Sequence, residues 1–145
     1  MSTKKVIIVD SNVYFRDALK RTLEDIGGVE IIAQFSKTDD FLNFITNNNS
    51  DIIFTEIRLE EKSGIDLIKR ALEIKPELTM IVYTSLEQQC IISRTLAYGA
   101  RGYLSKSKNN LNILKMIIEN PNERIYLSEG LLNVENRIMN SECVI

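Results

Sequence analysis

Apolar residues along the chain change between two periods, and the change predicts strands and helices in regular succession. The clearest strand is 6–9, where four β-branched residues follow one another and Asp10 ends the run. A strand that is apolar on both faces is typical of a central parallel strand covered by helices on each side. From Phe15 to Ile26 the apolar residues then recur every three or four positions, which indicates an amphipathic helix.

The same succession continues through most of the chain. Further strands are predicted at 29–35, 51–55, 79–83 and 101–104, and further helices at 40–46, between Gly64 and Pro76, at 87–98 and at 109–119. Parallel strands need crossover connections, and helices are the usual crossovers. Five strands alternating with five helices therefore predict an α/β fold with a doubly wound, five-stranded parallel sheet.

The end of the chain is less regular. Pro121 cannot continue the last predicted helix. We therefore predict one domain at 4–120 and a C-terminal linker at 121–145. A short helix is predicted within the linker at 128–138, and disorder is predicted for the last seven residues. The linker is neither long nor basic enough to hold a DNA-binding domain.

Composition and charge narrow the classes of function. With 145 residues, of which 44% are apolar, the chain can form one domain with a substantial core. The net charge of −2 and the pI near 5.3 argue against nucleic-acid or membrane partners. Because no long apolar run, signal peptide or metal-ligand spacing of cysteines is present, we expect a cytoplasmic location. The chain has no histidine, which excludes Ser-His-Asp and Cys-His catalysis.

Polar residues follow the predicted strands at the edge where such a fold binds ligands. In open parallel sheets the site lies outside the carboxyl ends of the strands. The side chains that follow strands one, three, four and five are small hydroxyls, carboxylates and a lysine: Asp10, Ser11, Glu56, Thr84, Ser85, Ser105 and Lys106. No glycine-rich loop follows the first strand, which argues against a nucleotide or flavin phosphate.

The order of these polar residues along the chain resembles that of the receiver domains of response regulators. That family has an acidic pair after strand one, a phosphoacceptor aspartate after strand three, a hydroxyl after strand four and a lysine after strand five. The resemblance covers about 4–120 and assigns these positions to Asp10 and Ser11, Glu56, Thr84 with Ser85, and Lys106, with Tyr103 as the switch aromatic and Gly64 at a family glycine. The segment Arg124-Ile-Tyr-Leu-Ser128 looks most like receivers of the LuxR/NarL group.

The resemblance also implies a fold and partners. The fold is the flavodoxin-like, CheY-like one with strand order 2-1-3-4-5. The partner is a protein: a sensor kinase, an output domain or another regulator. A homodimer could form through the first and fifth helices, where Tyr14, Phe15, Met116 and Ile117 lie, or through the face of helix four, strand five and helix five. The alternative for those four residues is that most of them belong to the core.

Two departures from the family pattern bear on function. Glu56 replaces the phosphoacceptor aspartate, and its extra methylene moves the carboxylate out of the attack geometry. Misplacement of this kind can cost roughly 10²-fold in rate. Ser11 replaces the second acid, so we expect no cofactor and at most weak Mg²⁺ binding at Asp10 and Glu56. The chain is therefore predicted not to be an enzyme, and no catalytic residue is assigned.

We expect an atypical receiver that acts without phosphorylation, with Glu56 paired to Lys106. Several alternatives stay open at this point. Glu56 could be an inert acid, Arg58 could neutralise it, or Lys106 could form a structural ion pair with Asp10. The chain could also be a working phospho-accepting receiver, a receiver fragment of a LuxR/NarL-type transcriptional regulator, or an unrelated α/β enzyme or cofactor carrier.

Overall fold

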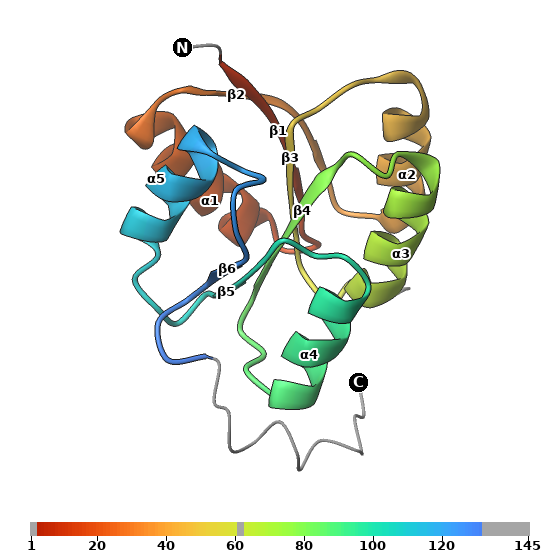
Figure 1. The fold of residues 1–145 in the computed structure, drawn as a ribbon. Helices are drawn as coiled ribbons and strands as arrows, with labels where there is room; N and C mark the ends of the chain where they lie inside the picture. Colours follow the sequence, from red (N-terminus) through yellow and green to blue (C-terminus); the bar gives the residue numbers. More distant parts are fainter. Residues whose placement is uncertain (1–2, 61–62, 132–145) are drawn as a thin grey trace.

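The computed structural model describes residues 3–60 and 63–131, and over these ranges strands and helices alternate (Figure 1). The strands are β1 (Lys4–Val9), β2 (Val29–Phe35), β3 (Ile52–Thr55), β4 (Thr79–Thr84), β5 (Gly102–Ser105) and β6 (Tyr126–Leu127). The helices are α1 (Val13–Ile26), α2 (Thr38–Asn47), α3 (Gly64–Ile74), α4 (Gln89–Ala97) and α5 (Leu111–Glu119).

All six strands form one parallel sheet in the order β2-β1-β3-β4-β5-β6. The predicted fold class and the order 2-1-3-4-5 are therefore confirmed. The sixth strand is an addition that the sequence pattern did not predict. It pairs with β5 through Gly102 opposite Tyr126 and Tyr103 opposite Leu127, and a run of two residues is too short to carry a period.

The sheet separates two apolar layers. Helices α1 and α5 cover one face, and α2, α3 and α4 cover the other (Figure 1). Residues at alternate positions of the buried central strands pack into one layer or the other, as the period of two in a strand requires: Ile7 and Val9 face the three-helix side, and Val6 and Ile8 face α1 and α5. This burial on both faces explains the uninterrupted apolar strand in the sequence.

Local signals fix where α1 begins and ends. The side chain of Asn12 accepts hydrogen bonds from the backbone N–H groups of Tyr14 and Phe15, so Asn12 is the N-cap. After the helix, Gly27 and Gly28 both have positive φ, at 88° and 78°, a conformation that glycine adopts without steric cost. The chain can therefore turn directly into β2.

The segment after α5 differs from the prediction. Residues 128–131 form a turn that follows β6, so the predicted helix at 128–138 is wrong over its first four residues. The remainder of that helix and the disorder predicted for the last seven residues lie outside the described residues. Within residues 3–60 and 63–131 no helix is long and apolar enough to cross a bilayer.

Candidate functional site

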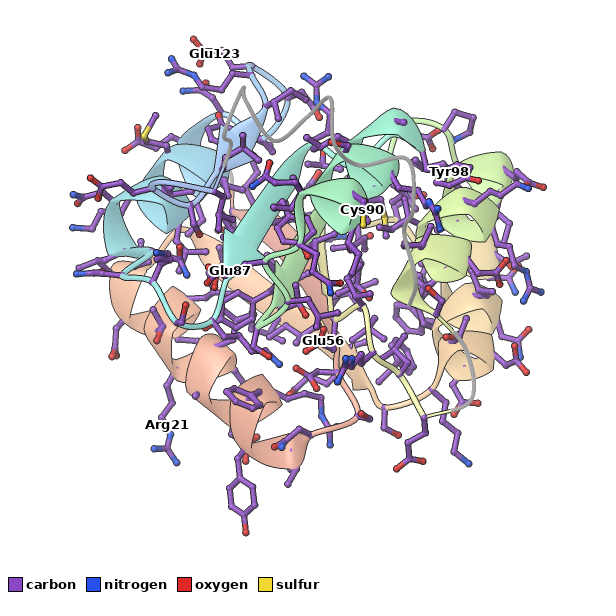
Figure 2. All side chains as sticks on the ribbon, turned by 90° about the horizontal axis from the view of Figure 1, so that it is seen from below. Arg21, Glu56, Glu87, Cys90, Tyr98 and Glu123 are labelled. Carbon is purple, nitrogen blue, oxygen red and sulfur yellow. The ribbon has the colours of Figure 1, made fainter. Side chains whose placement is uncertain are left out.

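Three charged side chains from different strands meet at the carboxyl edge of the sheet. Asp10, Glu56 and Lys106 each come directly after a strand, at the ends of β1, β3 and β5. Lys106 Nζ donates to Asp10 Oδ2 at 2.7 Å and to Glu56 Oε1 at 2.8 Å. All three side chains are less than 10% exposed. Figure 2 looks onto this edge and has Glu56 near its centre.

The backbone holds both carboxylates in place. Glu56 Oε2 accepts from the backbone N–H groups of Ile57, at 2.5 Å, and Arg58, at 3.2 Å. Asp10 Oδ1 accepts from the backbone N–H of Asn12 at 2.9 Å. Each carboxylate thus turns one oxygen to the backbone and the other to Lys106. The side chain of Arg58 is exposed, and its contact with Glu56 is made by the backbone.

Gly64 allows the turn that carries Glu56 to lie against the start of α3. A Cβ atom at position 64 would lie 2.1 Å from the carbonyl oxygen of Glu56 and 2.7 Å from Cα of Ile57. The N–H of Gly64 donates to the carbonyl of Ile57 at 2.7 Å. Only a glycine fits between these backbone atoms, which gives the family glycine a physical role next to the site.

Two aromatic rings complete the surroundings of Lys106. Its Nζ lies 3.8 Å from the ring centroid of Phe15 and 5.8 Å from that of Tyr83. Burial raises the pKa of Tyr83, so its hydroxyl is neutral at physiological pH. Phe15 and Tyr83 also line, together with Asp10 and Glu56, a narrow space that has no room for a water molecule. The sequence did not assign either ring to the site, although an aromatic residue immediately before Thr84 was a visible signal.

The other predicted site residues lie beside this cluster. Thr84 is buried, and its hydroxyl accepts from the backbone N–H of Leu86 at 3.4 Å. Tyr103 is buried and donates its hydroxyl to the carbonyl of Leu86 at 2.7 Å. The predicted hydroxyl and the predicted switch aromatic thus meet the same residue of the β4–α4 turn. Ser11 is half-buried and Ser85 is exposed.

A second polar network links the loops after β4 and β5. Glu87 Oε2 accepts from the hydroxyls of Ser105, at 2.5 Å, and Ser107, at 2.6 Å. These hydrogen bonds favour the ionised carboxylate and lower the pKa of Glu87. The sequence pattern did not predict Glu87, because only the path of both loops brings it to the serines.

The residues at this edge do not fit a magnesium site. Mg²⁺ needs free oxygen ligands in near-octahedral geometry, usually from one or two carboxylates and several waters. Here the oxygens of Asp10 and Glu56 are engaged by Lys106 and the backbone, and Ser11 stands where a second acid would follow Asp10. Across the described part of the chain, no group of three acidic or cysteine side chains could hold a metal ion.

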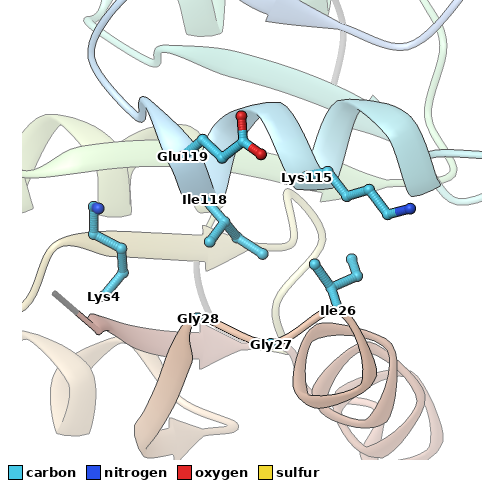
Figure 3. A pocket seen from close by; sticks show the side chains of 7 residues that line it. All are labelled: Lys4, Ile26, Gly27, Gly28, Lys115, Ile118 and Glu119. Atoms are coloured by element: carbon cyan, nitrogen blue, oxygen red, sulfur yellow. The ribbon is translucent and has the colours of Figure 1, made fainter. Parts of the chain in front are cut away.

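A pocket of about 330 Å³ lies at the opposite edge, where β1 begins and α1 ends (Figure 3). Ile26 and Ile118 face each other across it, and Lys4 and Lys115 lie on its two sides. It contains none of the residues that the sequence predicted for a site.

Comparisons with known proteins agree with this geometry. Residues 6–118 match the family model described as response regulator receiver domain. Response regulator GacA of Pseudomonas aeruginosa is 26% identical over 102 residues, which cover 70% of this chain and 48% of GacA. The chain spans about half the length of the curated relatives it matches.

Solved structures with the same fold include two response regulators. The RcsB response regulator of Salmonella typhimurium is 22% identical, with a TM-score of 0.81 over 90% of this chain and 64% of RcsB. A two-component response regulator of the LuxR family from Aurantimonas sp. SI85-9A1 is 18% identical, with a TM-score of 0.83 over 90% of this chain and 93% of its own. Another structure contains two RcsB dimers bound to two parallel DNAs.

Proposed function

Because the chain belongs to the response regulator receiver domain family, we propose that it is an atypical receiver that signals through protein contacts without being phosphorylated. One observation carries the proposal. The side chain at the phosphoacceptor position, Glu56, has its Oε1 atom 2.8 Å from Nζ of Lys106, which is the lysine that the family places after strand five.

The charge of this contact supports a partial imitation of phosphate. A glutamate carries one negative charge, whereas a phosphate carries about 1.5 to 2. Asp10 adds a second carboxylate contact to the same ammonium at 2.7 Å, so Lys106 is bound by two charges in total. Both hydrogen bonds are short and charge-assisted, which is the stronger class.

The arrangement of the β4–α4 turn supports a single, defined signalling state. Tyr103 lies inside the domain with its hydroxyl on the carbonyl of Leu86. The hydroxyl of Thr84 accepts from the N–H of the same residue. A protein that binds to the β4–α4 turn would therefore contact a surface whose conformation is fixed by buried hydrogen bonds. We propose that this partner is a sensor kinase, an output domain or another regulator.

Phosphotransfer tests the proposal directly. Incubation with acetyl phosphate and Mg²⁺, followed by intact-mass measurement, is expected to leave the wild-type protein unmodified. The double variant Ser11→Asp/Glu56→Asp restores the acidic pair and the shorter nucleophile, and it should gain one phosphoryl group. The matched control Ser11→Asp/Glu56→Asn keeps the second acid without a nucleophile and should gain none. A stable acyl phosphate on the wild-type protein would overturn the proposal and identify a working phospho-accepting receiver.

A second role is supported by the length of the relatives. The curated relatives are about twice as long as the matched segment, and one structural neighbour is a LuxR-family regulator. On this reading the chain is the receiver part of a LuxR/NarL-type transcriptional regulator, with output through a domain outside the sequence. The sequence of the gene on either side of the 145 codons tests this reading.

A further inference from the structure

We infer that Phe15 is a positioning residue that closes the acidic pocket over Lys106, so that an ammonium ion from the chain itself fills the place where a metal ion would bind. The inference rests on the proposed function and deepens it, because it concerns what keeps Lys106 and Glu56 paired. It also names the chemistry of the site: a cage for an organic cation, formed by two carboxylates and two aromatic rings.

The ammonium group of Lys106 is contacted by two carboxylates and by the face of one aromatic ring. An ammonium has three N–H donors. Two point to Asp10 and Glu56, at 2.7 and 2.8 Å. The face of the Phe15 ring lies against the group at 3.8 Å, within the range of a strong cation–π contact. The side chain of Lys106 is only 6% exposed, so water does not weaken these interactions as it would on the surface.

The position of Phe15 follows from the turn that carries Asp10. Asp10 Oδ1 accepts from the N–H of Asn12, and Asn12 Oδ1 accepts from the N–H groups of Tyr14 and Phe15. These three hydrogen bonds therefore fix the first turn of α1 relative to the carboxylate of Asp10. The same turn leaves Tyr14 82% exposed, against 42% for Phe15, and only the Phe15 ring lies over Lys106, so Tyr14 is a matched control.

Closure by the ring explains why the two carboxylates are not a metal site. Asp10, Phe15, Glu56 and Tyr83 line one narrow space, which has no room for a water molecule. A hydrated Mg²⁺ ion is larger than one water molecule and gives up its waters reluctantly. The pocket therefore excludes it as long as the ring and the ammonium are in place.

Ring-current shifts test the positioning role. In the wild-type protein the ε-methylene and Nζ resonances of Lys106, assigned with Lys106→Arg, should lie upfield because of the Phe15 ring. The shift should persist in Phe15→Tyr and Tyr14→Leu and disappear in Phe15→Leu, which keeps the apolar bulk but removes the ring face. Ordinary Lys106 shifts in the wild type, or an unchanged shift in Phe15→Leu, would overturn the inference. This measurement does not involve phosphate, so a failure of the proposed function would leave it unaffected.

Metal binding tests the closing role. In the Ser11→Asp/Glu56→Asp background, addition of Phe15→Ala should tighten Mn²⁺ binding, measured by electron paramagnetic resonance, by about tenfold, which corresponds to about 1.4 kcal/mol. Phe15→Leu, which opens less space, should give an intermediate affinity. Equal affinity with and without Phe15 would contradict the closing role, and Tyr14→Ala in the same background should change nothing.

Discussion

At the scale of single residues, one methylene group decides which partner the carboxylate at position 56 reaches. The longer side chain of Glu56 allows one oxygen to accept from the backbone of the next two residues while the other accepts from Lys106. Both oxygens are therefore bound, and the proposal of a receiver that is not phosphorylated rests on this arrangement. Removal of one partner of the buried pair would leave an uncompensated charge, which typically destabilises a protein by about 3–5 kcal/mol.

Glu87 provides a residue-scale prediction about pH. Hydrogen bonds from Ser105 and Ser107 lower its pKa, so the folded state favours the ionised carboxylate. Its contribution to stability is present above the pKa of the unfolded chain and is lost as the pH falls through the folded-state pKa. Ser107→Ala should raise the pKa of Glu87 toward its ordinary value, measured by an NMR titration of the carboxyl carbon. Ser85→Ala, at an exposed position of the same region, should leave the pKa of Glu87 where it is. A titration unchanged by Ser107→Ala would contradict the network.

The charged core of the site could be predicted from sequence, and its aromatic walls could not. The three charged residues each follow directly after a parallel strand: Asp10, Glu56 and Lys106. They meet because the carboxyl ends of parallel strands lie at one edge of the sheet, regardless of the path of the loops. Phe15 and Glu87 reach their partners only through the paths of the loops after β1, β4 and β5. For the same reason the hydroxyl of Thr84, predicted to join the charged cluster, instead accepts from Leu86.

At the scale of secondary-structure elements, β6 adds residues 126–127, which follow the last helix, to the sheet. The N–H groups of Tyr126 and Ser128 donate to the carbonyls of Arg101 and Tyr103. Leu131 is buried among the residues of the three-helix layer. The periodicity that predicted the other strands needs four or more residues, so a two-residue strand was not recognised. Gly102 was an indirect signal, because a Cβ atom there would lie 3.3 Å from Cβ of Tyr126.

We predict that Ser128 stabilises the packing of β6 against the rest of the domain. Its hydroxyl accepts from the N–H of Ser105 at 2.9 Å and donates to Asn110 Oδ1 at 2.5 Å. Ser128→Ala leaves two buried polar groups without partners and should lower the free energy of unfolding by about 1–3 kcal/mol. Urea denaturation measures the loss, and faster hydrogen exchange of the Ser105 amide locates it. The exposed Ser85→Ala should stay within about 0.5 kcal/mol of wild type. Equal losses in both variants would show that Ser128 has no special role.

At the scale of the whole molecule, the exposed apolar residues are concentrated on one side of the sheet. Val13, Tyr14 and Phe15 on α1 and Leu111 and Met116 on α5 are exposed, and these helices cover the same face (Figure 1). Of the four residues named from the sequence, only Ile117 is fully buried, so the alternative that most of them belong to the core is wrong. On the other candidate surface, β6 covers the edge of β5.

The surface of α1 and α5 is therefore the one predicted to form a homodimer. Exposed aromatic residues are the usual centres of such interfaces. Tyr14→Arg should weaken dimerisation at least about tenfold, equivalent to about 1.4 kcal/mol, in sedimentation equilibrium. Tyr98→Arg, which alters a half-exposed aromatic at the end of α4, is the matched control and should have no effect. Dimerisation lost in Tyr98→Arg and retained in Tyr14→Arg would assign the interface to the α4 side instead.

The source of the cation in the site has a consequence for how long a signal lasts. An acyl phosphate hydrolyses and a bound ion dissociates, so a signal that depends on either one has a limited lifetime. Lys106 is covalently part of the chain and is available from the moment the domain folds. Under the proposed function, the amount of protein that is synthesised and degraded sets the signal, and the output should follow the abundance of the protein more closely than the activity of any kinase.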